Sequence, residues 1–564
     1  MRSRSAPLLL VLPAATVLGT TAPAAPGDPQ VVVELQELLP DDPQPGANFG
    51  ESVALVGDVA VLGAGMADFF GAAYVFERGP SGWIRTHKLV SSDRDFADYF
   101  GESVDFDGNA IAVGAYRDDE GASAAGAAYV FVPQGGGWIQ QQKLVAGDAQ
   151  EEDLFGSGIG ISGGTVVVAA EEEDQAGLDA GAAYVFEWTG IAWRETRKVT
   201  GADTAAGDRF GRSIAIDGDT FVVGADRADG VSADTGAAYV FVESGGTWVQ
   251  QAKLVQPDPY LADHFGRSVA ISGETIVVGS PYDDDGGSGS GSAYVFVRAG
   301  SDWTLEAKLT AGDALPYDRF GFGVAVDGDF AAVGADGVDE LGANAGAAYV
   351  FTRSAAVWTE RGRIPGADPN SWYAEALACS GQTFVAGAQH APGSAGAGQG
   401  RAFAGALVDA FVPYCFGDGS GSACPCGNES APGAGQGCAN SSGAGARLDA
   451  GGTSGVAADD LAFDAANLLA AQPALLFAGE NAVAGGDGIA FGDGLRCAGQ
   501  NVVRLGVRIP DAGGGASWGP GLGALGGWGA GDVRRFQAWY RDPALGPCAT
   551  GFNLSNGVEV LFVP

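Results

Sequence analysis

A motif that recurs every 55 residues constrains this chain more than any other feature. The tetrapeptide Ala-Tyr-Val-Phe occurs six times at that spacing, beginning at Ala73, Ala128, Ala183, Ala238, Ala293 and Ala348. A Phe-Gly pair precedes each copy, a Trp follows it, and a Lys-Leu-like pair closes each unit. Repeats of this length that contain several short strands are typical of β-propellers and of solenoids.

The unit at residues 265–309 shows how each repeat is divided into strands. Alternating and apolar segments predict strands at 268–271, 275–279, 292–297 and 303–309, with a tight turn at Ser272-Gly273. The second segment is almost wholly apolar, which is typical of a strand buried on both faces. Each unit is therefore expected to form a four-stranded sheet.

A seventh unit is present but faded, and its last strand is missing. Tyr373-Ala374 replaces Phe-Gly, and no Trp or Lys-Leu pair follows. Residues 31–38 have the character of that missing strand, at the right distance before Phe49. An N-terminal strand can complete the last unit only if first and last units are neighbours. We therefore expect a closed, seven-bladed β-propeller over residues 31–412, which also removes exposed edge strands.

The sequence also resembles a known family. Phe-Gly followed by Ser-Val-Ala-Ile, then Val-Val-Gly-Ser and Ala-Tyr-Val-Phe, is similar to the FG-GAP repeats of integrin α-subunit propellers and bacterial secreted proteins. The resemblance implies a propeller fold and, in many such repeats, a calcium loop. Turns such as Asp217-Gly218-Asp219 lack the alternating ligands of that loop. Propellers have many unrelated functions, so the resemblance does not imply one.

The charge of the chain is strongly negative. Sixty-nine acidic residues outnumber 30 basic ones, giving a net charge of −39. Such a surface repels phosphates and anionic lipids, so nucleic acid and membranes are not expected partners. About half of the acidic residues fall in the connections at one end of the predicted sheets, so one face is expected to be acidic.

Asp283, Asp284 and Asp285 form one of the acidic loop clusters and are the candidate metal ligands. Ca²⁺ binds six to eight oxygen atoms in flexible geometry, which such a loop provides. Solvated loop carboxylates are the default interpretation, and calcium is the one cofactor that the sequence suggests.

No catalytic constellation is recognised in the sequence. The three histidines, His87, His264 and His390, occupy unrelated positions of the repeat. Aromatic residues that occur in one unit only, in the same connections, are better candidates for ligand contacts: Phe69, Tyr116, Tyr260, Tyr282, Tyr317 and Trp372.

The N-terminus predicts export. Residues 1–24 have a basic start, an apolar stretch and a small-residue cleavage site, as in a signal peptide. No later segment is long and apolar enough to span a membrane. The mature chain is expected to be secreted or held at a bacterial cell surface, as a monomer.

Residues 413–564 are predicted to form a second all-β domain, similar to a small sandwich. Strands are expected at 503–509, 536–541 and 558–563, with a turn at Asn556-Gly557 and a loose loop over 439–456. Six cysteines allow three disulfides in fifteen pairings, whereas Cys379 is expected to be a buried free thiol. The six are Cys415, Cys424, Cys426, Cys438, Cys497 and Cys548.

Three functions follow from these features. The leading hypothesis is an extracellular protein that presents an acidic propeller face to a protein or polysaccharide. An alternative is a polysaccharide-acting enzyme, which requires a cluster of non-repeated polar residues around the propeller axis. A third is a calcium-stabilised structural protein of the cell envelope.

Overall fold

The computed structural model describes residues 30–562, apart from 395, 410, 418–421, 453, 457, 487, 492, 530–531 and 544–549. The predicted signal peptide lies outside the described residues. Within the described residues, the chain divides into two compact units, the first formed by Val32–Leu407 and the second by Gln30, Val31 and the residues from Val408 onward. Within the described residues, no helix is long and apolar enough to cross a bilayer.

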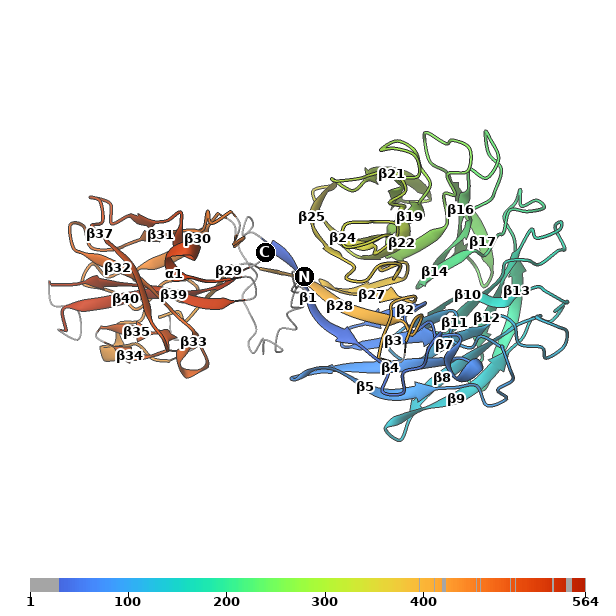
Figure 1. Cartoon of the computed structure of the whole chain (residues 1–564), viewed down its shortest axis with the longest axis horizontal. Helices are drawn as coiled ribbons and strands as arrows, with labels where there is room; N and C mark the ends of the chain where they lie inside the picture. Colours follow the sequence, from blue (N-terminus) through green and yellow to red (C-terminus); the bar gives the residue numbers. More distant parts are fainter. Residues whose placement is uncertain are drawn as a thin grey trace, which may run out of the picture. The chain divides into compact units, whose positions relative to one another are not determined.

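The first unit contains seven four-stranded sheets (Figure 1). Six are formed by strands consecutive in sequence and paired antiparallel, an arrangement consistent with a β-propeller. They are β2–β5 (Val53–Val56, Val59–Ala64, Ala72–Gly79, Gly82–Leu89), β6–β9 (Val104–Phe106, Ile111–Ala115, Ala127–Gln134, Gly137–Leu144), β10–β13 (Phe155–Ser162, Thr165–Ala170, Ala182–Trp188, Trp193–Val199), β14–β17 (Ser213–Asp217, Thr220–Ala225, Ala237–Glu243, Trp248–Leu254), β18–β21 (Ser268–Ser272, Thr275–Ser280, Ser292–Ala299, Asp302–Leu309) and β22–β25 (Phe320–Asp327, Phe330–Ala335, Ala347–Ser354, Val357–Pro365). A 3-10 turn, η1 (Ala67–Phe69), follows β3.

The seventh sheet combines the two ends of this unit. Its strand order is β1 (Gln30–Leu38), β28 (Arg401–Asp409), β27 (Thr383–Ala388) and β26 (Leu377–Ser380). The N-terminal segment therefore lies beside the faded last unit, in the place predicted for it. The predicted strands of residues 265–309 are also confirmed, and β19 is buried along its whole length.

The repeated motifs hold neighbouring sheets together. The amide of Phe265, a fully buried residue, donates to the Thr235 carbonyl of the preceding sheet at 3.1 Å. Gly236 lies opposite with φ +81°, and a Cβ there would collide with the Phe265 carbonyl. The recurrent Trp193 donates its indole N–H to Gln141 of the adjacent sheet at 2.8 Å. The motif residues are therefore contacts between sheets.

The residue before each Phe-Gly pair adopts a left-handed backbone conformation. Arg209 has φ +53° and His264 has φ +55°, and all seven equivalent residues lie between +51° and +58°. This region is unfavourable for residues with a Cβ. The His264 amide donates to the Asp234 carbonyl of the preceding sheet at 3.2 Å, which fixes the unusual geometry.

The second unit is also all-β. A five-stranded sheet, with strand order β29-β40-β39-β32-β37, and a three-stranded sheet, β30-β31-β38, share one core that includes Phe463, Phe536 and Trp518. Its elements are β29 (Phe411–Tyr414), η2 (Pro425–Gly427), β30 (Arg447–Gly451), β31 (Ala462–Ala466), β32 (Ala474–Gly479), β33 (Asn481–Ala482), η3 (Val483–Gly486), β34 (Ile489–Phe491), β35 (Gly494–Arg496), β36 (Ala498–Gly499), β37 (Val503–Arg508), β38 (Ala516–Trp518), α1 (Leu522–Gly526), β39 (Val533–Arg541) and β40 (Phe552–Leu561).

Two expectations for this unit are wrong. Asn556-Gly557 is not a turn but lies inside β40, where the buried Asn556 amide donates to the Leu448 carbonyl at 3.0 Å and links the two sheets. The segment 439–456 is not a loose loop throughout, because it contains β30. Asn-Gly favours a turn only where no buried partner competes for the amide.

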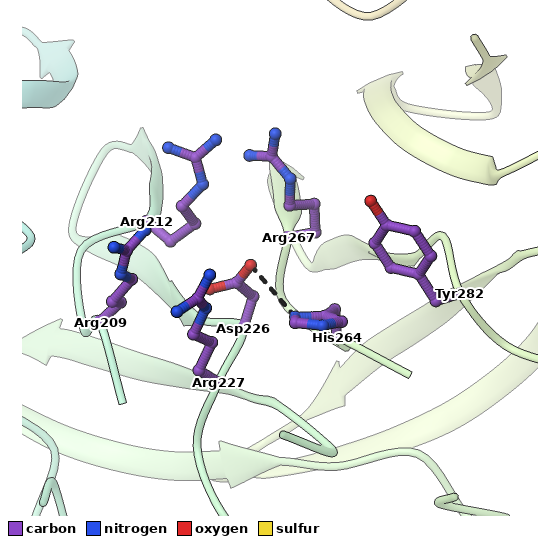
Figure 2. A pocket seen from close by; sticks show the side chains of 7 residues that line it. All are labelled: Arg209, Arg212, Asp226, Arg227, His264, Arg267 and Tyr282. Carbon is purple, nitrogen blue, oxygen red and sulfur yellow. Dashed lines mark ion pairs between the residues drawn. The ribbon is translucent and has the colours of Figure 1, made fainter. Parts of the chain in front are cut away.

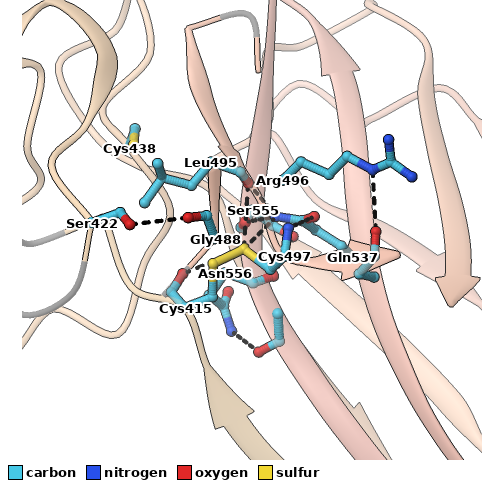
Figure 3. The surroundings of a disulfide bond; sticks show 12 residues. Cys415, Ser422, Cys438, Gly488, Leu495, Arg496, Cys497, Gln537, Ser555 and Asn556 are labelled. Atoms are coloured by element: carbon cyan, nitrogen blue, oxygen red, sulfur yellow. Dashed lines mark hydrogen bonds between the residues drawn. A yellow bond between two sulfur atoms is a disulfide. The ribbon is translucent and has the colours of Figure 1, made fainter. Parts of the chain in front are cut away.

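Disulfides join Cys415 to Cys497 and Cys424 to Cys438. Figure 3 shows the first of these beside Gln537, whose side chain donates to the Leu495 carbonyl at 2.7 Å. Cys548 and the side chain of Cys426 lie outside the described residues. Cys379 in β26 is a free thiol, and it is half-buried rather than fully buried. Burial raises the pKa of that thiol well above its usual range.

Candidate functional site

Many of the loop carboxylates form ion pairs and hydrogen bonds in an arrangement that repeats from sheet to sheet. In the second sheet, Lys143 contacts Asp93 at 2.7 Å and Asp118 at 2.8 Å. Tyr129, from the Ala-Tyr-Val-Phe motif, donates to the same two carboxylates. We call this set of a lysine, a tyrosine and its carboxylates a lysine network. Asp118 is buried, which corrects the expectation that these acids are solvated.

The candidate calcium ligands belong to such a lysine network. Lys308 lies 2.9 Å from Asp283 and 2.5 Å from Asp285. Asp284 accepts the Gly289 amide at 2.7 Å. The cation that these carboxylates contact is thus a lysine ammonium group. The described residues contain no group of three or more His, Cys, Asp or Glu side chains arranged to hold a metal.

A cavity of a different character lies between the fourth and fifth sheets. It encloses about 300 Å³. Most of its lining is basic although the chain as a whole is strongly acidic (Figure 2). We call it the arginine pocket; its residues are Arg209, Arg212, Asp226, Arg227, His264, Arg267 and Tyr282.

The pocket is built from positions that vary from unit to unit. Arg212 and Arg267 each follow a Phe-Gly pair, 55 residues apart, and neighbouring sheets place them next to each other. The equivalent residues of other units include Glu102 and Phe322. Because repeated motifs supply the packing, the side chains at these strand ends are free to differ.

The arginines have too few partners among the described residues. Arg212 reaches Glu171 at 3.5 Å and Arg209 reaches Glu172 at 3.2 Å. Neither Arg227 nor Arg267 forms an ion pair within the described part of the chain. The guanidinium of Arg267 instead lies over the Phe322 ring, 4.4 Å from its centroid. Stacking of this kind leaves the N–H edge available for a ligand.

The pKa shifts also reflect the shortage of carboxylate partners around the pocket arginines. Burial and the neighbouring Arg212 guanidinium lower the pKa of Arg267 to about 10. For Asp226, burial raises the pKa, but His264, Arg212 and Arg267 outweigh it, and the net shift is downward. The buried Asp226 Oδ1 atom has no hydrogen-bond partner in the described structure. An anionic ligand would supply the negative charge needed to balance the Arg212 and Arg267 guanidinium groups.

Acidic residues from other sheets influence the pKa of Arg212. Glu171, Asp226, Glu102 and Glu375 all raise the pKa of Arg212, and they outweigh the lowering by burial. Burial, together with Glu375 and Glu171, raises the pKa of Glu102 to about 7 even though Arg212 opposes the shift. Non-repeated charged residues from the second, third, fourth and seventh sheets therefore converge beside the arginine pocket.

Sequence reasoning found only part of this site. Among the aromatic candidates, Tyr282 lines the pocket, whereas Tyr116 contacts Tyr99 and Trp372 contacts His390. The sequence does not single out His264, because the other histidines occupy different positions of the repeat. The missed signal was the tetrapeptide Phe-Gly-Arg-Ser, which occurs twice, at Phe210 and Phe265.

Repeated four-stranded sheets with variable strand ends define an all-β repeat protein, and comparison with protein families gives the particular family. The model of the FG-GAP repeat matches residues 32–76, 83–131, 138–186, 193–241, 248–296 and 303–351, just over half of the chain. This chain belongs to the FG-GAP repeat family.

Comparisons with individual proteins add little. No curated protein matches. Among solved structures, a chain of the mitotic checkpoint complex has a TM-score of 0.44 and 11% identity, covering 72% of this chain and 100% of that one. Saccharomyces cerevisiae Sqt1 has a TM-score of 0.36 and 11% identity, covering 64% and 84%. Both TM-scores are below 0.5, so neither similarity bears on function.

Proposed function

We propose that the seven sheets close into a seven-bladed β-propeller. The seventh sheet contains β1, and β2 packs against β26 and β27. The Phe49 amide donates to the Gln399 carbonyl at 3.0 Å, and the same bond joins Phe265 to Thr235 between consecutive sheets. The contact from last sheet to first is thus of the same kind as the others, which supports closure.

We further propose that this is an exported binding protein that takes an anionic group of a polysaccharide into the arginine pocket. The observation that carries the proposal is Arg267, a half-buried residue whose guanidinium lies beside Arg212 and has no carboxylate ion-pair partner in the described residues. Paired guanidinium groups suit carboxylate or sulfate oxygens, which they bind with two parallel hydrogen bonds.

A polysaccharide fits this site better than a protein surface does. A cavity of about 300 Å³ is at the lower end of the range for small-molecule sites, and protein partners usually need a far larger, flatter area. The acidic loops carry less weight, because buried carboxylates such as Asp118 are neutralised within the lysine networks. Two disulfides support export, since they persist in oxidising compartments.

Binding of defined polymers to the full chain tests this proposal. Polygalacturonate carries carboxylates, dextran sulfate carries sulfates, and dextran is uncharged. We expect at least one charged polymer, but not dextran, to bind in isothermal titration, and more weakly as salt rises. Arg267→Ala should weaken binding about 10- to 100-fold, the effect of one charged hydrogen-bonding group.

Arg361→Ala is the matched control, because Arg361 is exposed in β25 and bonds to the Thr352 hydroxyl. This variant should bind like the parent chain. Equal binding by the Arg267→Ala and parent chains, or no binding of either charged polymer, would refute the proposed site.

A further inference from the structure

Two residues of the arginine pocket are not needed for anion binding, and both can transfer protons. His264 and Tyr282 line the pocket, with ring centroids 5.1 Å apart in an edge-on arrangement. Tyr282 follows β19, while His264 precedes β18 of the same sheet. Figure 2 shows the Tyr282 hydroxyl directed to the side of the pocket where the Arg267 guanidinium lies.

His264 is oriented by a buried carboxylate. Its Nδ1 lies 3.5 Å from Asp226 Oδ2, and Asp226 is itself buried (Figure 2). A carboxylate at Nδ1 favours the tautomer with the proton on that atom, which leaves the Nε2 lone pair to accept another proton. The pocket therefore combines an oriented base, a phenol and paired guanidinium groups.

We propose that the arginine pocket catalyses β-elimination on polysaccharides that contain uronic acids, a step that rests on the proposed function. Arg212 and Arg267 bind the C6 carboxylate of a uronate residue and stabilise the negative charge that develops when its neighbouring C5–H bond is broken. Elimination needs a base, an acid and a cationic group beside the carboxylate, and the pocket supplies all three.

The bonds and protons of this step balance without a further reactant. His264 Nε2 takes the C5 proton, the C5–H electrons form the C4–C5 double bond, and the C4–O4 bond breaks. Tyr282 gives its hydroxyl proton to O4, which becomes the new reducing end. Proton return from His264 to the Tyr282 phenolate restores the site. One glycosidic bond is lost, and no water or oxidant is consumed.

The test uses the full chain with polygalacturonate and alginate as uronate polymers and dextran sulfate as an anion that cannot undergo this elimination. We expect new ultraviolet absorbance from the conjugated double bond with a uronate polymer, and products that mass spectrometry finds one water lighter than hydrolysis products. Dextran sulfate should give neither signal.

Variants separate catalysis from binding. Tyr282→Phe and His264→Gln should each lower kcat about 100-fold or more while binding changes less than threefold. Asp226→Asn should shift the pH profile of kcat, because it changes the partner of His264. Tyr414→Phe is the matched control, since Tyr414 lies in β29 of the second unit and is not among the residues lining the pocket, and it should leave kcat unchanged.

The outcomes also distinguish this inference from the binding proposal. Uronate binding that depends on Arg267 without any unsaturated product would overturn elimination and leave binding intact. Full activity of Tyr282→Phe would overturn the role of that residue as the acid. Absence of binding to every charged polymer would overturn both proposals.

Discussion

The first unit carries two kinds of charged cluster, and they differ in how completely the charges are matched. In the lysine network of the second sheet, the Lys143 ammonium contacts three carboxylates, Asp93, Asp118 and Glu120. In the arginine pocket, Arg267 has a second guanidinium beside it and no ion pair within the described residues. The networks recur in register with the repeat, whereas the pocket occurs between one pair of sheets.

This difference indicates that the lysine networks serve the stability of the fold, whereas the arginine pocket serves the proposed binding. In a lysine network, the attraction between the ammonium group and the carboxylates offsets the cost of removing them from water. The resulting ion pair fixes the loops at the end of a sheet. A half-buried cation without an ion-pair partner, such as Arg267, costs stability, and unfavourable features of this kind concentrate at functional sites. The comparison predicts that removing a network charge destabilises the fold without affecting binding. Removing a pocket charge should instead weaken binding without destabilising the fold.

The largest expected effect is that of Lys143→Ala on stability. Asp118 is buried and would lose its ammonium partner, so the free energy of unfolding should fall by about 3–5 kcal/mol. Urea denaturation of the variant and parent chains measures the difference. Polymer binding should not change.

The chain contains its own control for this experiment. Lys253 occupies the equivalent position of the fourth sheet, but its carboxylate partner Asp203 is largely exposed, and Ala228 replaces the buried acid. Lys253→Ala should cost about 1 kcal/mol or less. Equal losses in the two variants would show that burial of the carboxylate does not determine the cost.

The fold could largely be predicted from the sequence, because it depends on features that repeat, whereas the lysine networks could not. Six copies of one motif defined the strands of each sheet, and the faded seventh copy placed β1 beside β28. The sequence also showed acids gathered at one end of the sheets. It did not show that Lys143 and Tyr129, from two other strands of the sheet, reach those acids, since that depends on strand register.

The arginine pocket could not be predicted in the same way, because it depends on what does not repeat. Arg212 and Arg267 are 55 residues apart, and only the packing of adjacent sheets makes them neighbours. His264 has no equivalent histidine in the other units, so a search for shared residues passes over it. Positions that vary within a regular repeat are therefore where a site should be sought.

The next largest effect concerns pH, because two aspartates of the same loop shift in opposite directions. Burial raises the pKa of Asp93, but Lys143 and Tyr129 outweigh it, so the net shift is downward. Burial raises the pKa of Asp98 to about 6. A lowered pKa adds stability that is lost as the pH falls below about 4, whereas a raised pKa adds stability that is lost as the pH rises from about 4 to 6.

Through these two groups, stability should be greatest near pH 4 and decline on both sides, as urea denaturation from pH 3 to 8 would show. Asp98→Asn should reduce the decline between pH 4 and 6 by up to about 3 kcal/mol, the equivalent of two pKa units. Asp93→Asn should instead reduce the decline below pH 4. A curve that rises steadily from pH 4 to 8 would contradict this assignment.

The smallest expected effect is the most direct test of the comparison. Arg267→Gln removes a guanidinium that repels Arg212 and forms no ion pair among the described residues, while retaining a polar side chain of similar reach. Its unfolding free energy should equal that of the parent chain or exceed it by up to about 1 kcal/mol, because like-charge repulsion is relieved. Polymer binding, measured on the same sample, should fall. If Arg267→Gln were destabilised as strongly as Lys143→Ala, the arginine would be part of the structural framework, and the distinction between matched networks and an unmatched pocket would fail.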